Sequence, residues 1–258
     1  FIVSSGKYKV NSDLVVPPNA TLVIKAGTTL EFSKSSCLIC YGSIEASANS
    51  LDPVILTDQG KGWGGIFIHN PKGQSSFKFC LFENVNGAGY ISNPNGIYRA
   101  GWNLTGALSS YDSNITIENC IFTKMNTEDA LNIFGGNFKL SDCNFSNTYS
   151  DAFDGDFVSG SVQRCSFTNI GGDAIDFSGS NAHITKCSFS EITDKAISVG
   201  EKSNVIADSI FVQKAAFGVV SKDQSVVDLS ASTICNASIA AVSAYQKKPE
   251  FGPAKFSV

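Results

Sequence analysis

The stretch CNFSNTYSDAFDGDFVSGSVQR (143–164) is followed by CSFTNIGGDAIDFSGSNAHITK (165–186) and then by CSFSEITDKAISVG (187–200). Each segment opens on a cysteine, has a phenylalanine two residues later, and carries Asp-Ala or Lys-Ala from the eighth residue after the cysteine. The same Cys-x-Phe pattern stands at Cys120, 23 residues earlier, and at Cys80, a further 40 residues upstream. A repeat this short indicates a solenoid, because one unit cannot bury its own apolar face and must stack on its neighbours.

Short alternating runs indicate that the coils consist of strands. ITIE (115–118) and HITK (183–186) alternate apolar and polar residues, and Gly, Asn, Ser and Asp separate such runs. No segment carries an apolar stripe of helical period long enough to compete. About 22 residues hold three short strands and three turns, but not a strand and a helix with their loops. The sequence therefore predicts an all-β fold, a right-handed parallel β-helix of about eleven coils.

The repeats continue through the chain, so we expect one domain over residues 1–258. Irregular coils should occupy residues 1–85, and regular coils should occupy residues 104–258. The 40-residue step before Cys120 is too long for one coil and places an insertion at 88–105, just before a strand. Insertions in solenoids often build a binding face. A lid that packs its own aromatic side chains on the solenoid is the alternative.

Composition limits the partners. The net charge of −4 and the pI near 5.2 argue against nucleic acid and anionic membranes. No run of about 18 apolar residues is present, so we expect no membrane insertion. The chain begins at Phe1 without a signal region, as expected of a mature or excised piece joined to other domains of a parent protein. We expect that parent outside the cell, on the cell surface or in the periplasm.

The cysteines predict a buried stack. Five of the eight occupy one repeat position before an inward phenylalanine, where they should pack on one another as small apolar side chains. Strand-ladder geometry is poor for disulfides, so we expect free thiols. Cys37 and Cys40 form a CxxC within a strand-like run, but no second pair follows, so neither a zinc site nor a redox role is expected.

Polar residues that flank the alanines should form two columns on one outer face. The first column is Asp129, Asp151, Asp173 and Lys195, and the second is Asn132, Asp154, Asp176 and Ser198. Stacked carboxylates repel each other and need a cation, a shared proton or a positive neighbour, and Lys195 can neutralise Asp173. Oxygen ligands suit calcium, for which we expect Asp151, Asp154 and Asp156 as ligands. The same closeness suits a general acid/base pair in glycoside cleavage. A ladder that only keeps the sheet face soluble is the remaining interpretation.

Successive coils resemble the catalytic coils of the polygalacturonase family, which are also right-handed β-helices. The matching stretches are YSDA (149–152), GDAI (172–175), DKAISVG (194–200) and GVVSK (218–222). The resemblance implies that Asp151 and Asp173 are catalytic carboxylates and that Lys222 binds substrate. Where that family has its third carboxylate, its histidine and its arginine, this chain has Gly172, Lys195 and Val220.

A lysine beside aspartates is also similar to β-helix polysaccharide lyases, in which calcium acidifies a uronate and a lysine removes its C5 proton. DKAISVGE (194–201) and YQKKPEFG (245–252) resemble stretches of uncharacterised bacterial β-helix proteins. We expect the catalytic residues to be Asp151, Asp173 and Lys195, and the substrate-binding residues to be Asp154, Asp176, Lys222, Tyr98, Arg99 and Trp102. Two function classes stay open: a lyase, hydrolase or epimerase acting on an acidic polysaccharide, and a non-catalytic glycan-binding or rigid structural module.

Overall fold

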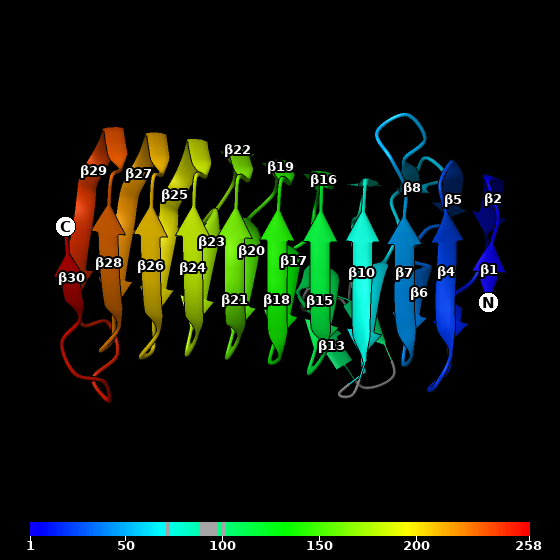
Figure 1. Ribbon diagram of the computed structural model, residues 1–258, viewed down its shortest axis with the longest axis horizontal. Coiled ribbons are helices and arrows are strands. Elements are labelled where there is room, and N and C mark those ends of the chain that lie inside the picture. The colour runs from blue at the N-terminus through cyan, green and yellow to red at the C-terminus, as the bar shows by residue number, and fades with distance from the viewer. Residues whose placement is uncertain (71–72, 88–96, 100–101) are drawn as a thin grey trace.

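The strands stack in parallel along one axis, and the two termini lie at opposite ends of the stack (Figure 1). The computed structural model describes residues 1–70, 73–87, 97–99 and 102–258, without the side chains of residues 97–99, 102 and 103. Every regular element in these ranges is a strand, so the predicted all-β parallel β-helix is confirmed. Within them, no helix has the length and apolar character needed to cross a membrane.

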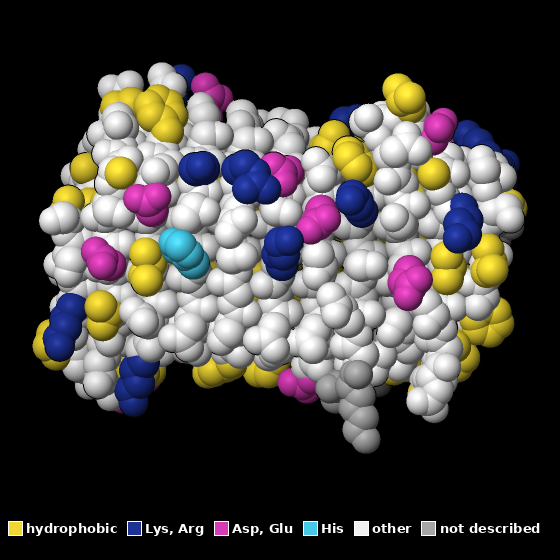
Figure 2. Space-filling view, in the orientation of Figure 1, with side chains coloured by type: hydrophobic (Ala, Val, Ile, Leu, Met, Phe, Trp, Pro, Cys, Tyr) yellow, Lys and Arg dark blue, Asp and Glu magenta, His cyan; other side chains and the backbone are white. Residues whose placement is uncertain are grey.

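Each coil contributes to three parallel ladders. The first ladder is an 11-stranded sheet of β1 (Ile2–Val3), β4 (Thr21–Lys25), β7 (Ser43–Ser47), β10 (Gln74–Lys78), β15 (Asn114–Glu118), β18 (Asn137–Ser141), β21 (Ser159–Gln163), β24 (Asn181–Thr185), β26 (Asn204–Asp208), β28 (Val226–Ser230) and β30 (Lys255–Ser257). Its outer surface carries interspersed charges of both signs (Figure 2). This is typical of a solvated sheet face.

The other two ladders belong to one 17-stranded sheet. The second ladder contains β2 (Gly6–Val10), β5 (Thr28–Phe32), β8 (Val54–Asp58), β11 (Cys80–Glu83), β16 (Ile121–Met125), β19 (Asn144–Thr148) and β22 (Ser166–Ile170). The third contains β3 (Leu14–Val16), β6 (Cys37–Cys40), β9 (Gly65–His69), β14 (Gly106–Tyr111), β17 (Asp129–Phe134), β20 (Asp151–Asp156) and β23 (Ile175–Ser178). The long strands β25 (Ser188–Gly200), β27 (Phe211–Lys222) and β29 (Thr233–Tyr245) pass through both ladders.

One buried apolar cluster extends through the solenoid from Val16 to Leu229. Apolar and polar residues alternate along the strands, and the apolar ones fill this cluster. In β15, Ile115 and Ile117 point inward, while the polar residues between and after them point outward. The phenylalanines of the repeat stack nearly parallel, with ring centroids 4.6 Å apart for Phe122 and Phe145 and 5.1 Å apart for Phe145 and Phe167. The repeat position that predicted the fold therefore forms the centre of the core.

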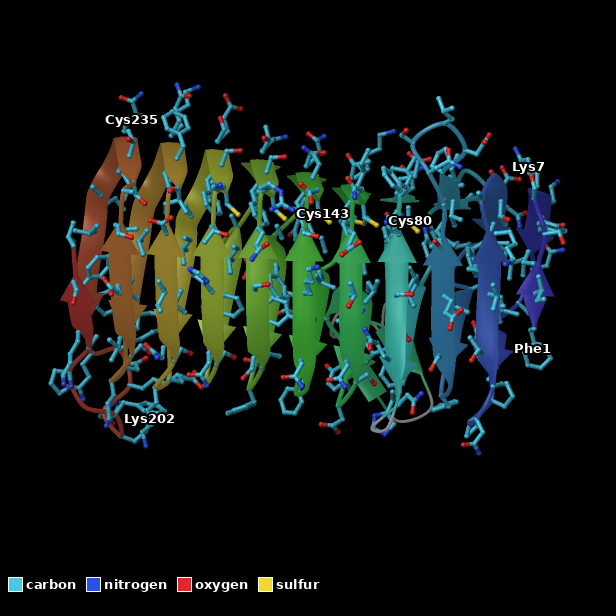
Figure 3. All side chains as sticks on the ribbon, viewed as in Figure 1. Phe1, Lys7, Cys80, Cys143, Lys202 and Cys235 are labelled. Carbon is cyan, nitrogen blue, oxygen red and sulfur yellow. The ribbon has the colours of Figure 1, made fainter. Side chains whose placement is uncertain are left out.

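The cysteines behave as predicted. All eight are free thiols, and the five at the repeat position are buried. Their sulfur atoms form a row along the solenoid, from Cys80 past Cys143 (Figure 3). The backbone N–H of Cys143 donates a 3.4 Å hydrogen bond to Cys165 Sγ. Cys37 belongs to a small apolar cluster on the outer face, whereas Cys40 lies in the main core, so the CxxC does not converge on one site.

Left-handed turn residues recur once per coil, directly before the cysteine position. Asn119, Asp142, Arg164 and Lys186 have φ values of 52° to 56°. This conformation costs a side-chain-bearing residue about 1 kcal/mol. Stacking offsets the cost, because each turn donates its backbone N–H to the next coil, as in the 2.9 Å bond from Asp142 to Gln163 O.

The insertion adds two short antiparallel strands, β12 (Ile97–Arg99) and β13 (Trp102–Leu104), and leads directly into β14. Leu104 is buried on the outer face of the third ladder, where it packs with Ile39 and Phe67. The insertion therefore covers the N-terminal part of the face that carries the aspartates further along. The side chains of Tyr98, Arg99 and Trp102, expected to bind substrate, lie outside the described residues.

Candidate functional site

The two predicted columns lie side by side on the outer face of the third ladder. Asp129 pairs with Asp151, Asp154 pairs with Asp176, and Asp176 pairs with Ser198 in the strand register. We call the outer surface of β17, β20, β23 and β25 the acidic face. Ala130 and Ala152 are absent from the strand pairing although the register is the same on both sides of them, and each is buried together with the apolar residue that follows it. The columns are not fully open to solvent, because Asp129, Asn132 and Ser198 are buried.

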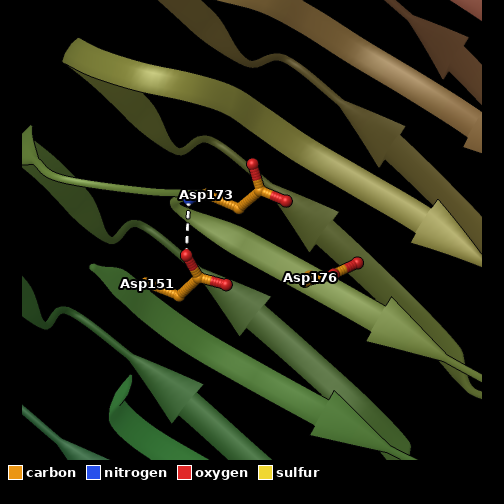
Figure 4. Close-up of side chains that lie close together, drawn as sticks. All are labelled: Asp151, Asp173 and Asp176. Atoms are coloured by element: carbon orange, nitrogen blue, oxygen red, sulfur yellow. Dashed lines mark hydrogen bonds between the residues drawn. The ribbon is translucent and has the colours of Figure 1, made fainter. Parts of the chain in front are cut away.

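A chain of hydrogen bonds joins the first column. Asp151 Oδ1 accepts a 2.8 Å bond from the backbone N–H of Asp173 (Figure 4). Asp173 Oδ1 accepts a 2.9 Å bond from the backbone N–H of Lys195, one coil further on. A side chain at Gly172 would place its Cβ 2.0 Å from Asp151 Oδ1, so the glycine leaves room for this carboxylate. The backbone therefore fixes both carboxylates on the same side of the solenoid.

Two lysines balance part of the negative charge. Lys195 Nζ lies 3.2 Å from Asp173 Oδ1 and 2.5 Å from Asp194 Oδ2. Lys222 Nζ lies 3.7 Å from Asp176 Oδ1 and reaches it across Gly200, where a Cβ would come within 3.3 Å of Lys222 Cε. The sequence predicted the contact between Lys195 and Asp173. It did not predict the pair of Lys222 with Asp176, which spans two coils.

Burial, together with the charges of neighbouring carboxylates, raises the pKa values of the carboxyl groups on the acidic face. Burial, with the charge of Asp176, raises the pKa of Asp173 to about 7 in spite of the neighbouring ammonium group of Lys195. Burial also raises the pKa of Asp151. Burial and then the charges of Asp176 and Glu201 raise that of Asp156 to about 6. The face therefore holds carboxyl groups that exchange protons near neutral pH.

Lys195 is held in its charged form. Burial lowers its pKa, but the hydrogen bond to Asp194 and the charge of Asp173 outweigh burial and raise the pKa to about 12. Asp194 was not among the expected site residues, although its position directly before Lys195 was a usable signal. A lysine with this pKa acts as a fixed positive charge rather than as a proton acceptor.

Asp151, Asp173 and Asp176 form the acidic group that best matches a cation site among the described residues. One carboxylate oxygen from each lies within 4.8 Å of the others (Figure 4). This set differs from the expected ligands Asp151, Asp154 and Asp156. Asp154 instead accepts a 3.1 Å hydrogen bond from Asn132 Nδ2. Burial raises the pKa of Asp154 well above its usual range, and the charges of Asp129 and Asp156 raise it further.

The second column also contains buried polar atoms without a hydrogen bond among the described residues. Asn132 Oδ1 and Ser198 Oγ are two of them, and Asp176 Oδ1 is a third, which has an ion pair with Lys222 at 3.7 Å but no hydrogen bond. Leaving a buried polar atom unpaired costs about 1–3 kcal/mol, so such atoms are usually met by solvent or a ligand. They lie in one column along the solenoid axis, which suits a polar ligand that extends along the coils.

Comparison with known proteins identifies the fold. Residues 64–251 match the family described as right handed beta helix region. An alginate lyase from Paenibacillus sp. str. FPU-7 has a similar structure, with a TM-score of 0.51 and 12% identity over 93% of this chain and 99% of that one. The gp42 tailspike of Acinetobacter phage vb_AbaP_AS12 aligns with a TM-score of 0.41 and 10% identity, over 95% of this chain and 58% of the tailspike. No curated protein sequence matches the chain.

Proposed function

This chain belongs to the right-handed β-helix family, and from that premise we propose that its acidic face binds a polysaccharide and cleaves it. The observation that carries the proposal is the convergence of Asp151, Asp173 and Asp176, with oxygens within 4.8 Å of one another. Glycosidic bonds are cleaved by paired carboxyl groups, one of which holds a proton near neutral pH. Asp173, with a pKa of about 7, meets that requirement.

Roles follow from the geometry. Asp173 is the group that holds and releases a proton, because its pKa lies near the operating pH. Asp151 is the second carboxyl group, and its position is set by the hydrogen bond from the backbone of Asp173. Lys195 stabilises negative charge and orients Asp173. Because the pKa of Lys195 is about 12, hydrolysis suits this site better than proton abstraction by the lysine.

An acidic polysaccharide can bind the acidic face only if the repulsion between their carboxylates is neutralised. A uronate chain carries one carboxylate per residue, and the acidic face would repel it. A divalent cation between the two sets of carboxylates removes that repulsion. Asp151 and Asp176 offer oxygen ligands of the type that calcium prefers, while Asp173 beside them keeps the proton needed for cleavage. Calcium would supply positive charge that holds a uronate against them. We therefore propose that binding of an acidic polysaccharide depends on calcium.

The test combines substrate and product chemistry. The protein is incubated with uronate-containing and neutral polysaccharides, with Ca²⁺ or with a chelator. New reducing ends report cleavage of any kind, and ultraviolet absorbance of an unsaturated sugar reports elimination. We expect reducing ends without the absorbance, and stimulation by Ca²⁺ only on uronate chains. Absorbance rising in step with reducing ends would instead identify a lyase.

One observation favours a second candidate, a non-catalytic module. Asp151 and Asp173 each accept a hydrogen bond from a backbone N–H of the next coil. A ladder of this kind stabilises the stack whether or not a ligand binds. A module predicts retention of polysaccharide without new reducing ends, or no retention at all. The screen described above separates these outcomes from hydrolysis.

A further inference from the structure

An aromatic ladder borders the acidic face. Tyr111 stacks on Phe134 with ring centroids 5.6 Å apart and an interplanar angle of 21°. Phe134 meets Phe157 edge to face at 5.5 Å. Phe134 is 38% exposed and Phe157 is 59% exposed. Adjacent exposed aromatic rings with a polar border are typical of a ligand-binding surface.

Phe157 occupies a left-handed turn at the edge of the acidic face. Phe157 follows the end of β20 and has φ of 54°, a conformation that bulky residues rarely adopt. The turns at the same place in the preceding and following coils use Gly135, with φ of 72°, and Gly179, with φ of 61°. The ring of Phe157 lies over Gly179, where a Cβ would come within 2.6 Å of Cδ1. An aromatic residue therefore stands in a left-handed turn where the two neighbouring coils use glycine, and its ring projects beside the acidic face.

The ladder continues directly into the acidic face. Tyr111 pairs with Phe134, and Phe134 pairs with Asp156, in the strand register of successive coils. Burial raises the pKa of Tyr111 to about 12, and the charges of Asp129, Asp154 and Asp156 contribute to the rise. The phenol of Tyr111 therefore lies within electrostatic reach of the carboxylates. Rings and carboxyl groups form one continuous row along the solenoid axis.

We propose that Tyr111, Phe134 and Phe157 form a sugar-stacking subsite that holds a polysaccharide chain parallel to the solenoid axis. This inference rests on the proposed function of the acidic face. The apolar face of a pyranose ring presents C–H groups of partial positive charge, which suit the negative face of an aromatic ring. The sugar hydroxyls of the next residue along the chain then reach Asp156 and Asp154. The ladder sets the direction of the chain, which then runs alongside the columns of carboxylates.

The test uses matched single substitutions. Phe134→Ala and Phe157→Gly remove rings of the ladder, and Phe157→Gly restores the residue that neighbouring coils use. Phe211→Ala is the control, because Phe211 is 44% exposed but begins β27 on the second ladder, away from the acidic face. Native gels containing polygalacturonate, alginate or a neutral mannan, run with Ca²⁺, measure retardation. Thermal melting of each variant reports folding.

We expect the wild type to be retarded by at least one polymer. Phe134→Ala and Phe157→Gly should then weaken binding about 3- to 10-fold, and Phe211→Ala should leave it unchanged. Phe157→Gly should keep or raise Tm, because it relieves the left-handed phenylalanine. Equal retardation of wild type and both ladder variants would overturn the subsite while leaving the acidic face as the binding surface. Absence of retardation of the wild type by every polymer would overturn the proposed function and the subsite together.

Discussion

The carboxylate of Asp151 accepts a 2.8 Å hydrogen bond from the backbone N–H of Asp173, one coil further along the solenoid. Asp173 repeats this relationship with the backbone N–H of Lys195 at 2.9 Å. Each carboxylate is thus held by the backbone of the coil that follows it, and Asp173 also pairs with the ammonium group of Lys195 in that coil. Burial raises the pKa of Asp151 and of Asp173, and the charge of Asp176 raises both further, whereas the hydrogen bond from the backbone of Asp173 acts to lower the pKa of Asp151.

Lys195→Ala should lower the free energy of unfolding by about 1–3 kcal/mol. The side chains of Lys195 and Asp173 are only 13% and 8% exposed, so removal of the ammonium group leaves Asp173 beside Asp176 without compensation. Protonation of Asp173 limits the loss. Urea denaturation at neutral pH measures it.

Lys214→Ala is the matched control for that substitution. Lys214 forms a 3.1 Å pair with Glu191, but the two side chains are 64% and 53% exposed. Exposed pairs contribute little, so we expect a change below about 0.5 kcal/mol. Equal effects of the two substitutions would mean that the pair of Lys195 and Asp173 is no more buried in solution than a surface pair.

Stability should fall as the pH rises towards 8. The pKa of Asp173 is about 7 in the folded protein against 3.8 for an ordinary aspartate, and that of Asp156 is about 6. Between pH 3.8, the pKa of an ordinary aspartate, and the raised pKa of each carboxyl group in the folded protein, the folded state binds more protons than the unfolded state. The free energy of unfolding therefore decreases as the pH rises through this range. We expect Tm to be at least about 2 °C lower at pH 8 than at pH 5.

Asp173→Asn should make that pH dependence shallower. Asparagine keeps an oxygen that can accept the backbone N–H of Lys195 but has no proton to lose. Thermal melts of both proteins between pH 5 and 8 measure the difference. Identical slopes would show that Asp173 does not titrate in this range. Exposed carboxylates whose pKa values are lowered, such as Asp142 beside Arg164, act in the opposite direction only at lower pH.

In the native protein, Cys235 should be the thiol that reacts with a thiol reagent. It is partly exposed, whereas the other seven cysteines are buried. Their acidity also disfavours reaction, since a hydrogen bond with Cys143, together with burial, raises the pKa of Cys165 to about 12. Mass spectrometry should find one label before denaturation and eight after it. Fast labelling of Cys143 in the native state would contradict the stacked core.

The repeat gave enough information to predict the fold and the register of the acidic face. The 22-residue step from Cys143 to Cys165 brings Asp151 and Asp173 to the same face, because every coil turns once. The alternation within β15 identified the inward residues. Where spacing alone determines position, sequence reasoning was sufficient.

The sequence did not predict contacts between residues that lie in different columns of different coils. Lys222 reaches Asp176 two coils back and passes close to Gly200, where a Cβ would come within 3.3 Å of Lys222 Cε. The near-neutral pKa of Asp173 depends on burial and on Asp176, neither of which a one-coil spacing reveals. Asp173 and Asp176, rather than the expected Asp154 and Asp156, gather with Asp151 for a similar reason: distances between columns depend on side-chain direction as well as register.

The most direct measurement is the rate of glycosidic bond cleavage by wild type, Asp173→Asn and Asp228→Asn on the polysaccharide that the screen identifies. Asp228 is exposed on β28 of the first ladder and serves as a carboxylate away from the acidic face. We expect Asp173→Asn to lower the rate about 100-fold or more while Tm is retained, and Asp228→Asn to cleave at the wild-type rate. Cleavage by Asp173→Asn at the wild-type rate would contradict the assignment of the acidic face as the active site.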